Sequence, residues 1–259
     1  LSLVIGPFLN NAGGLSLIFA VMAALAGVGV LIVAFWTPAE PGTHQQIAPA
    51  PPGALRQLLF SADLVRLNLG VFILYAVQIS TWVGLPFLLV QAGLAVSDHG
   101  WLYLPVVLMS FVVMGATLFP MERKGRLRGL FLISIALVLV VQLGFALESL
   151  GAISLTAMGL WMFLFFCGFN VLEASQPSQA SRLAPPAVRA TVLGIYNTLQ
   201  SLGIFAGGAI GGLLSKKIGV TGLFGLNAAM LALWLLAAWG MRVVPVHQSH
   251  TGVSNTSLN

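Results

Sequence analysis

Seven apolar runs, each long enough to cross a lipid bilayer, follow one another along this chain of 259 residues. A membrane-spanning helix needs about 20 apolar residues. The runs cover residues 14–36, 65–91, 100–120, 128–148, 153–176, 190–214 and 220–241. Within each run the apolar residues are continuous rather than alternating with polar ones, which favours helices over the strands of a membrane barrel. The sequence therefore predicts an all-α polytopic membrane protein.

The composition excludes the main alternatives to a membrane protein. Only 7% of the residues are charged and 58% are hydrophobic, whereas a soluble domain carries about 25% charged residues. The single cysteine, Cys167, cannot form an internal disulfide. The net charge of +5 comes from basic residues in the short gaps between apolar runs. Those residues therefore indicate membrane topology, and we expect no nucleic-acid partner.

The basic residues predict the orientation of the chain, because short cytoplasmic loops of membrane proteins are enriched in Lys and Arg. Nine of the eleven lie on one side of the membrane: Arg56, Arg66, Arg123, Lys124, Arg126, Arg128, Arg182, Arg189 and Arg242. The other side has only Lys216 and Lys217. We therefore expect the first side, and with it the C-terminus, to be cytoplasmic.

One long polar interruption divides the chain. Residues 37–63 are rich in proline and are predicted to form a cytoplasmic linker. This linker separates a helical segment, 1–36, from a block of six spans, 64–243, and residues 244–259 form a polar tail. The sequence begins inside an apolar run without a methionine. We therefore expect it to be a fragment of a longer protein.

Several motifs resemble transporters of the major facilitator superfamily. Gly6-Pro7 followed by Gly13-Gly14 is similar to the fifth-to-sixth helix region of drug:proton antiporters. Glu122, Gly125 and Arg126 resemble the superfamily's cytoplasmic loop signature. A longer stretch resembles the YajR-like branch of bacterial drug exporters; it includes residues 169–177, 183–185, 194–197 and 207–212.

This resemblance implies a fold of two six-helix halves joined by a cytoplasmic loop. The chain would then hold a partial fifth helix, the sixth helix, the loop and the complete C-terminal half. It also implies proton-coupled efflux of small lipophilic or drug-like molecules across the bacterial inner membrane, by alternating access. The partners expected are the lipid bilayer, a small-molecule substrate and protons, with the protein a monomer. A non-transporting membrane scaffold or sensor stays open as the alternative.

Glu173 is the one acidic residue predicted to lie within a span, near its cytoplasmic end. A carboxyl group inside a membrane is by default a functional candidate, here for proton transfer or for binding a cationic substrate. The alternative is a structural hydrogen bond to a neighbouring helix. Asn170 and Gln176 flank Glu173 at three residues on either side, so the three are predicted to share about one helical face.

Two further polar groups are candidates for the substrate pathway. Tyr75, Gln78 and Trp82 form one helical stripe, which suits flat lipophilic substrates. Asn197 and Gln200 lie one turn apart in a later span. In both groups, packing between helices is the alternative to contact with substrate.

Two other patterns predict structural roles. Gly203, Gly207 and Gly211 recur every four residues, which is typical of closely packed membrane helices. In the loop motif, the resemblance to the superfamily implies that Glu122 holds a neighbouring helix end or an arginine as a latch. Alternatively, the motif and the basic residues around it set topology and bind anionic lipid.

The sequence contains no pattern that predicts a metal site or an enzyme active site. The four histidines, His44, His99, His247 and His250, are scattered without ligand spacing, so we expect no metal site. We find no phosphate-binding loop and no hydrolase triad, and therefore expect neither an enzyme nor a cofactor, only a proton gradient.

Overall fold

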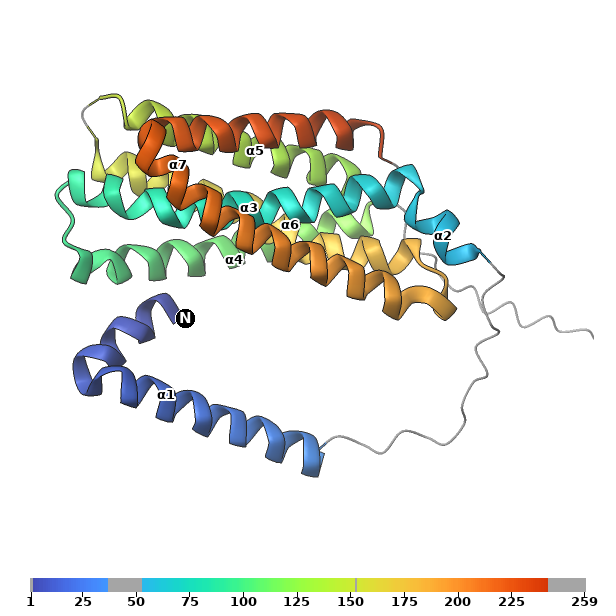
Figure 1. Ribbon diagram of the computed structural model, residues 1–259, viewed down its shortest axis with the longest axis horizontal. Helices are drawn as coiled ribbons and strands as arrows, with labels where there is room; N and C mark the ends of the chain where they lie inside the picture. The colour runs from blue at the N-terminus through green and yellow to red at the C-terminus, as the bar shows by residue number, and fades with distance from the viewer. Residues whose placement is uncertain (1, 37–52, 152, 242–259) are drawn as a thin grey trace, which may run out of the picture.

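The computed structural model describes residues 2–36, 53–151 and 153–241, and the regular structure of these residues is helical throughout (Figure 1). The α-helices are α1 (Ser2–Trp36), α2 (Ala54–Leu59), α3 (Ala62–Gln91), α4 (His99–Arg123), α5 (Leu127–Glu148), α6 (Leu155–Leu183) and α7 (Arg189–Trp239). Two short 3₁₀ helices, η1 (Val96–Asp98) and η2 (Pro186–Val188), precede α4 and α7. Six helices of the described residues are long and apolar enough to cross a membrane. The predicted all-α polytopic fold is confirmed.

Helix α7 contains two of the seven predicted spans. It is 51 residues long, but Gly219 interrupts it with φ 73° and ψ 177°. Glycine adopts this backbone conformation readily because it lacks Cβ. The chain reverses direction at this point (Figure 1), so α7 has a first arm, residues 189–218, and a second arm, residues 220–239. These arms correspond to the spans predicted at 190–214 and 220–241.

Helix α6 extends beyond its predicted end. The apolar run stops at residue 176, yet the helix continues through Pro177 to Leu183. Proline removes only one backbone donor, and membrane helices tolerate it where neighbouring groups compensate. The predicted polar gap of residues 177–189 is therefore largely helical, and the extension places Glu173 farther from the end of its helix.

Successive helices from α3 to α7 run in alternating directions, so their ends gather in two groups (Figure 1). The starts of α3, α5 and α7 lie with the ends of α4 and α6. We call this the arginine end, because it carries Arg66, Arg123, Lys124, Arg126, Arg128, Arg182 and Arg189. The opposite end has the turn of α7, with Lys216 and Lys217.

The glycines of the first arm of α7 lie directly against α3. A Cβ atom at Gly203 would be 2.5 Å from the backbone oxygen of Phe72, and one at Gly207 would be 2.3 Å from that of Ala76. At Gly211 it would be 3.2 Å from Cα of Ser80. Only residues without a side chain allow two helices to approach this closely, which explains the four-residue repeat of glycine.

The segments outside the bundle are only partly described. Helix α1 contacts α4. Gly14, with φ 64°, interrupts α1 at the residue where the predicted span 14–36 begins. Of the predicted linker 37–63, residues 37–52 lie outside the described residues. The rest forms α2 and the start of α3. The predicted tail 244–259 also lies outside the described residues.

Candidate functional site

Glu173 lies well inside a membrane-spanning helix. It lies ten positions before the end of α6 at Leu183, which corresponds to about 15 Å along the axis. The other acidic residues that the structure describes lie at or near helix ends: Asp63, Asp98, Glu122 and Glu148. Glu173 therefore lies farther from the end of α6 than from the end of the apolar run at residue 176, because the helix continues beyond that run.

A tyrosine from another helix binds the Glu173 carboxylate. The Tyr75 hydroxyl of α3 donates a hydrogen bond of 3.0 Å to Oε1 of Glu173. Tyr75 is buried, and its ring contacts that of Phe169 edge-on at 5.9 Å between centroids. A hydrogen bond to a charged acceptor is stronger than one between neutral groups. This contact therefore joins α3 to α6 at the carboxylate.

Two residues of the first arm of α7 complete this group. Tyr196 lies close enough to Glu173 for an electrostatic interaction between the two side chains. Its buried hydroxyl has no hydrogen-bond partner among the described residues. Gln200 lies beside the Tyr75 hydroxyl. We call Glu173, Tyr75, Tyr196 and Gln200 the Glu173 cluster. Within the described ranges no Lys or Arg pairs with Glu173. The carboxylate is therefore available to a proton or to a cation.

The residues that flank Glu173 do not share its partners. Asn170 is buried and donates a 2.8 Å hydrogen bond from Nδ2 to the Ser110 hydroxyl of α4. Gln176 is fully buried, and neither polar atom of its amide has a partner among the described residues. A step of three residues rotates the side chain by about 60° around the helix, so the predicted common face divides between different neighbours.

The other predicted pathway residues have different surroundings. Gln78 is half-buried on α3. Trp82 packs against Tyr103 of α4 and Phe166 of α6, with centroids 5.1 and 5.9 Å away. Asn197 is exposed. The structure thus brings Tyr75 to Glu173 and Gln200 to Tyr75, and it leaves Gln78, Trp82 and Asn197 outside the cluster.

A buried polar network that the sequence analysis missed joins α3, α5 and α7. Ser80 donates to Oδ1 of Asn227 at 3.0 Å, and Asn227 donates to Oε1 of Gln142 at 3.1 Å. Gln142 in turn donates to the Thr81 hydroxyl at 3.0 Å. All four side chains are buried. Gln142 and Asn227 stand alone as amides inside apolar runs, and this was the signal available in the sequence.

The loop motif forms an ion pair at the arginine end. The Glu122 carboxylate of α4 binds the Arg182 guanidinium of α6, and both residues line a small pocket of about 40 Å³ together with Gln179 and Ser178. Gly125 supplies the turn after α4, with φ 67°, and Arg126 is exposed. The predicted contact between Glu122 and an arginine exists, while its role as a latch stays a prediction.

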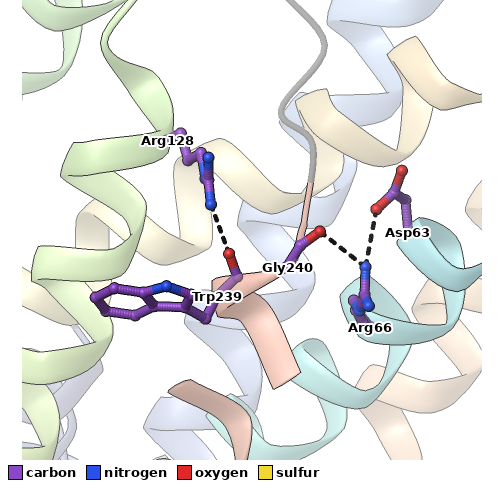
Figure 2. Close-up of polar contacts among 5 residues, drawn as sticks. All are labelled: Asp63, Arg66, Arg128, Trp239 and Gly240. Carbon is purple, nitrogen blue, oxygen red and sulfur yellow. Dashed lines mark hydrogen bonds and ion pairs between the residues drawn. The ribbon is translucent and has the colours of Figure 1, made fainter. Parts of the chain in front are cut away.

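Two arginines bind the end of the last helix (Figure 2). Arg66 of α3 donates to the Gly240 carbonyl at 2.9 Å, and Arg128 of α5 donates to the Trp239 carbonyl. Arg66 also pairs with Asp63. The last carbonyls of a helix lack partners within it and carry partial negative charge. These contacts therefore fix the end of α7 to α3 and α5.

Comparison with known proteins places these features in a family. The sequence model of the Major Facilitator Superfamily matches residues 1–208. The inner membrane transport protein YajR of Escherichia coli is 28% identical over 252 residues, which are 95% of this chain and 54% of that protein. A transporter of Buchnera aphidicola, described as uncharacterized, is 28% identical over 80% of this chain and 53% of its own length. The chain thus spans about half the length of these relatives.

Proposed function

The chain belongs to the Major Facilitator Superfamily, and on this premise we propose that it is the C-terminal part of a secondary active transporter that exports small lipophilic molecules in exchange for protons. Transporters of this kind bind their substrate between two halves that rock against each other. In this proposal α3 to α7 form the second half, and α1 forms the end of the first.

The Glu173 cluster is the observation that carries the proposal. An ionisable group inside a membrane protein is energetically costly and is therefore by default a functional candidate. This one has a hydroxyl donor but no basic partner among the described residues. When Glu173 is ionised, it attracts a cationic substrate and accepts strong hydrogen bonds from tyrosine. When it is protonated, that attraction is lost. Proton binding and substrate binding at one carboxylate thus exclude each other, as exchange requires.

Two observations support the cellular location that we propose. The E. coli relative carries the name of an inner membrane transport protein. The arginine end gathers most basic residues of the bundle, and basic loops stay in the cytoplasm. We therefore assign the protein to the bacterial inner membrane with the arginine end, and the C-terminus of the chain, in the cytoplasm.

The test uses the complete polypeptide in inside-out membrane vesicles with an imposed proton gradient. Ethidium, a flat lipophilic cation, serves as the transported probe and is followed by its fluorescence. We expect Glu173→Gln to abolish gradient-driven uptake of the probe, and Glu173→Asp to retain part of it. Glu148→Gln is the matched control, because it makes the same chemical change at a helix end far from the cluster.

Unchanged uptake in Glu173→Gln would reduce Glu173 to a structural role. If the unsubstituted protein moves no ethidium at all, efflux of lipophilic cations is wrong. The alternative, a non-transporting scaffold or sensor, then becomes the better description.

A further inference from the structure

Buried polar atoms without a hydrogen-bond partner gather on one side of Glu173. Among the residues that the structure describes there are six such side-chain atoms, and all lie four to seven positions from the start or end of a helix at the arginine end. They belong to Asn68 of α3, Gln176 and Gln179 of α6, and Tyr196 and Trp234 of α7. This places them about 6–11 Å inside the arginine end, whereas Glu173 is ten positions inside it.

The buried polar side chains towards the opposite end bind one another instead. Gln142 lies six positions before the end of α5, and Asn227 lies seven positions after the start of the second arm of α7. Both amides use their nitrogen and their oxygen in hydrogen bonds to each other, to Ser80 and to Thr81. Buried polar groups in proteins are almost always hydrogen-bonded, to protein or to ordered water. The protein meets this need by itself on one side of Glu173, and on the other side water is required.

Gln176 shows this need most clearly. Its side chain is fully buried, and neither Nε2 nor Oε1 has a partner among the described residues. Gln176 lies three positions after Glu173 and three before Gln179, and residues spaced in this way are neighbours on a helix, with Cβ atoms about 5–6 Å apart. Gln179 is 3% exposed, and its Nε2 also lacks a partner within the described ranges. We call Glu173, Gln176 and Gln179 the α6 row, because they lead from the carboxylate towards the arginine end.

Two further features of α6 suit bound water along this row. Pro177 has no N–H, so the backbone carbonyl of Glu173 lacks its usual partner in the helix. Gln179 lines the pocket of about 40 Å³ beside Glu122 and Arg182, and this volume exceeds what one water molecule needs. A buried water makes about three hydrogen bonds to polar groups of the protein. The carboxyl, carbonyl and amide groups of the α6 row supply such partners.

We propose that Gln176 is a positioning residue for proton transfer, which holds water between Glu173 and Gln179 and so connects the carboxylate to the arginine end. This inference rests on the proposed function, in which Glu173 exchanges protons. The O–H bond of the protonated carboxyl breaks, water at Gln176 takes the proton, and this water passes a proton on to water at Gln179 and to the aqueous side. The Gln176 amide accepts through Oε1 and donates through Nε2, and it keeps its own hydrogens throughout.

The test measures how fast Glu173 takes up a proton, without substrate. The complete polypeptide in lipid nanodiscs is mixed with a caged proton, a flash lowers the pH, and time-resolved infrared spectroscopy follows the C=O band of protonated carboxyl groups. The component missing from Glu173→Gln belongs to Glu173. We expect this component to appear at least about tenfold more slowly in Gln176→Leu, which is the effect on a rate of losing one hydrogen bond to a charged group.

The matched control makes the same substitution on the other side of Glu173. Gln142→Leu removes a buried amide towards the opposite end, and it should leave the protonation rate of Glu173 unchanged. Gln179→Leu should slow protonation as Gln176→Leu does, because it interrupts the α6 row nearer to the arginine end. Gln176→Asn keeps an amide at this position and should therefore be faster than Gln176→Leu. Tryptophan fluorescence during heating shows that each variant is folded.

Three results overturn the proposal. They are an unchanged rate in Gln176→Leu, an equal slowing in Gln142→Leu, and a Glu173 band that does not form after the flash. If Gln176→Leu does not fold, Gln179→Leu decides, and an unchanged rate in that variant overturns the proposal in the same way. The rate is measured without transport, so a protein that moves no ethidium refutes the proposed function and leaves the role of Gln176 to its own result.

Discussion

Replacing Gly207 by alanine should force α3 and the first arm of α7 apart. A Cβ atom at this position would be 2.3 Å from the Ala76 oxygen and 2.9 Å from its Cα. Both obstacles are backbone atoms, which cannot rotate away as a flexible side chain does. Ordinary contact begins near 3.4 Å, so the two helices must separate locally by roughly 1 Å.

The expected loss of stability follows from this separation. Overpacking of this kind costs about 1–3 kcal/mol. The neighbouring contacts of Gly203 and Gly211 with α3 also open, and a gap of about 1 Å forfeits a quarter to a half of each contact's attraction. The substitution itself stabilises the helix by about 1 kcal/mol, because alanine has a higher helix propensity than glycine.

The matched control lies on the same helix. A Cβ atom at Gly212 would meet nothing within 4 Å, so Gly212→Ala gains the helix preference without a clash. The helix preference is common to both variants and cancels, so they should differ by the overpacking cost of about 1–3 kcal/mol. In a protein of this size that corresponds to roughly 2–12 °C in apparent unfolding temperature. Tryptophan fluorescence during heating in one detergent measures both variants under the same conditions.

Equal unfolding temperatures for the two alanine variants would refute the packing argument. It would mean that Gly207 does not face the backbone of α3. Gly208→Ala adds a graded check, because its Cβ would contact Ile79 at an ordinary 3.6 Å. Its unfolding temperature should lie close to that of Gly212→Ala.

Two other substitutions test contacts at the arginine end and in the core. Arg66→Gln and Arg128→Gln should each lower stability by about 0.3–1 kcal/mol, because they remove a cation from the end of α7. The loss should shrink when unfolding is measured at high salt, which screens exposed charges; a loss that does not depend on salt would contradict the electrostatic cause. Gln142→Leu should cost about 1–3 kcal/mol, because the partners Thr81 and Asn227 stay buried with unmade hydrogen bonds. An unfolding temperature equal to that of the unsubstituted protein would mean that the network contributes nothing.

The number and position of the helices could be predicted because the bilayer dictates them. A spanning segment must satisfy its own backbone and cover about 30 Å of hydrocarbon, and both demands are local in sequence. The glycine repeat was equally local, since close approach needs a small residue at each contact. The end of α6 was misplaced because polar residues such as Gln179 and Arg182 mark the edge of an apolar run but do not end a helix.

The contacts of the candidate site were not predictable in the same way. Tyr75 and Glu173 are 98 positions apart, and only the packing of α3 on α6 brings them together. The partner of Asn170, the Ser110 hydroxyl, is 60 positions away on α4. A helical pattern states which residues share a face, but it does not state which helix that face meets. For this reason the sequence identified Glu173 and Tyr75 separately and missed their hydrogen bond.

The contacts around α3 show where a change at Glu173 would act. The glycine contacts and the bond from Ser80 to Asn227 fix α3 to α7. Helix α5 also lies close to α6, since a Cβ at Gly168 would be 3.0 Å from the Ser134 backbone oxygen. Between α3 and α6, by contrast, the bond from Tyr75 to Glu173 is the one hydrogen bond among the described residues. Protonation weakens that bond, because a neutral carboxyl accepts less strongly than a carboxylate. A proton on Glu173 therefore loosens the interface of α3 and α6 and leaves the tighter contacts of each helix intact.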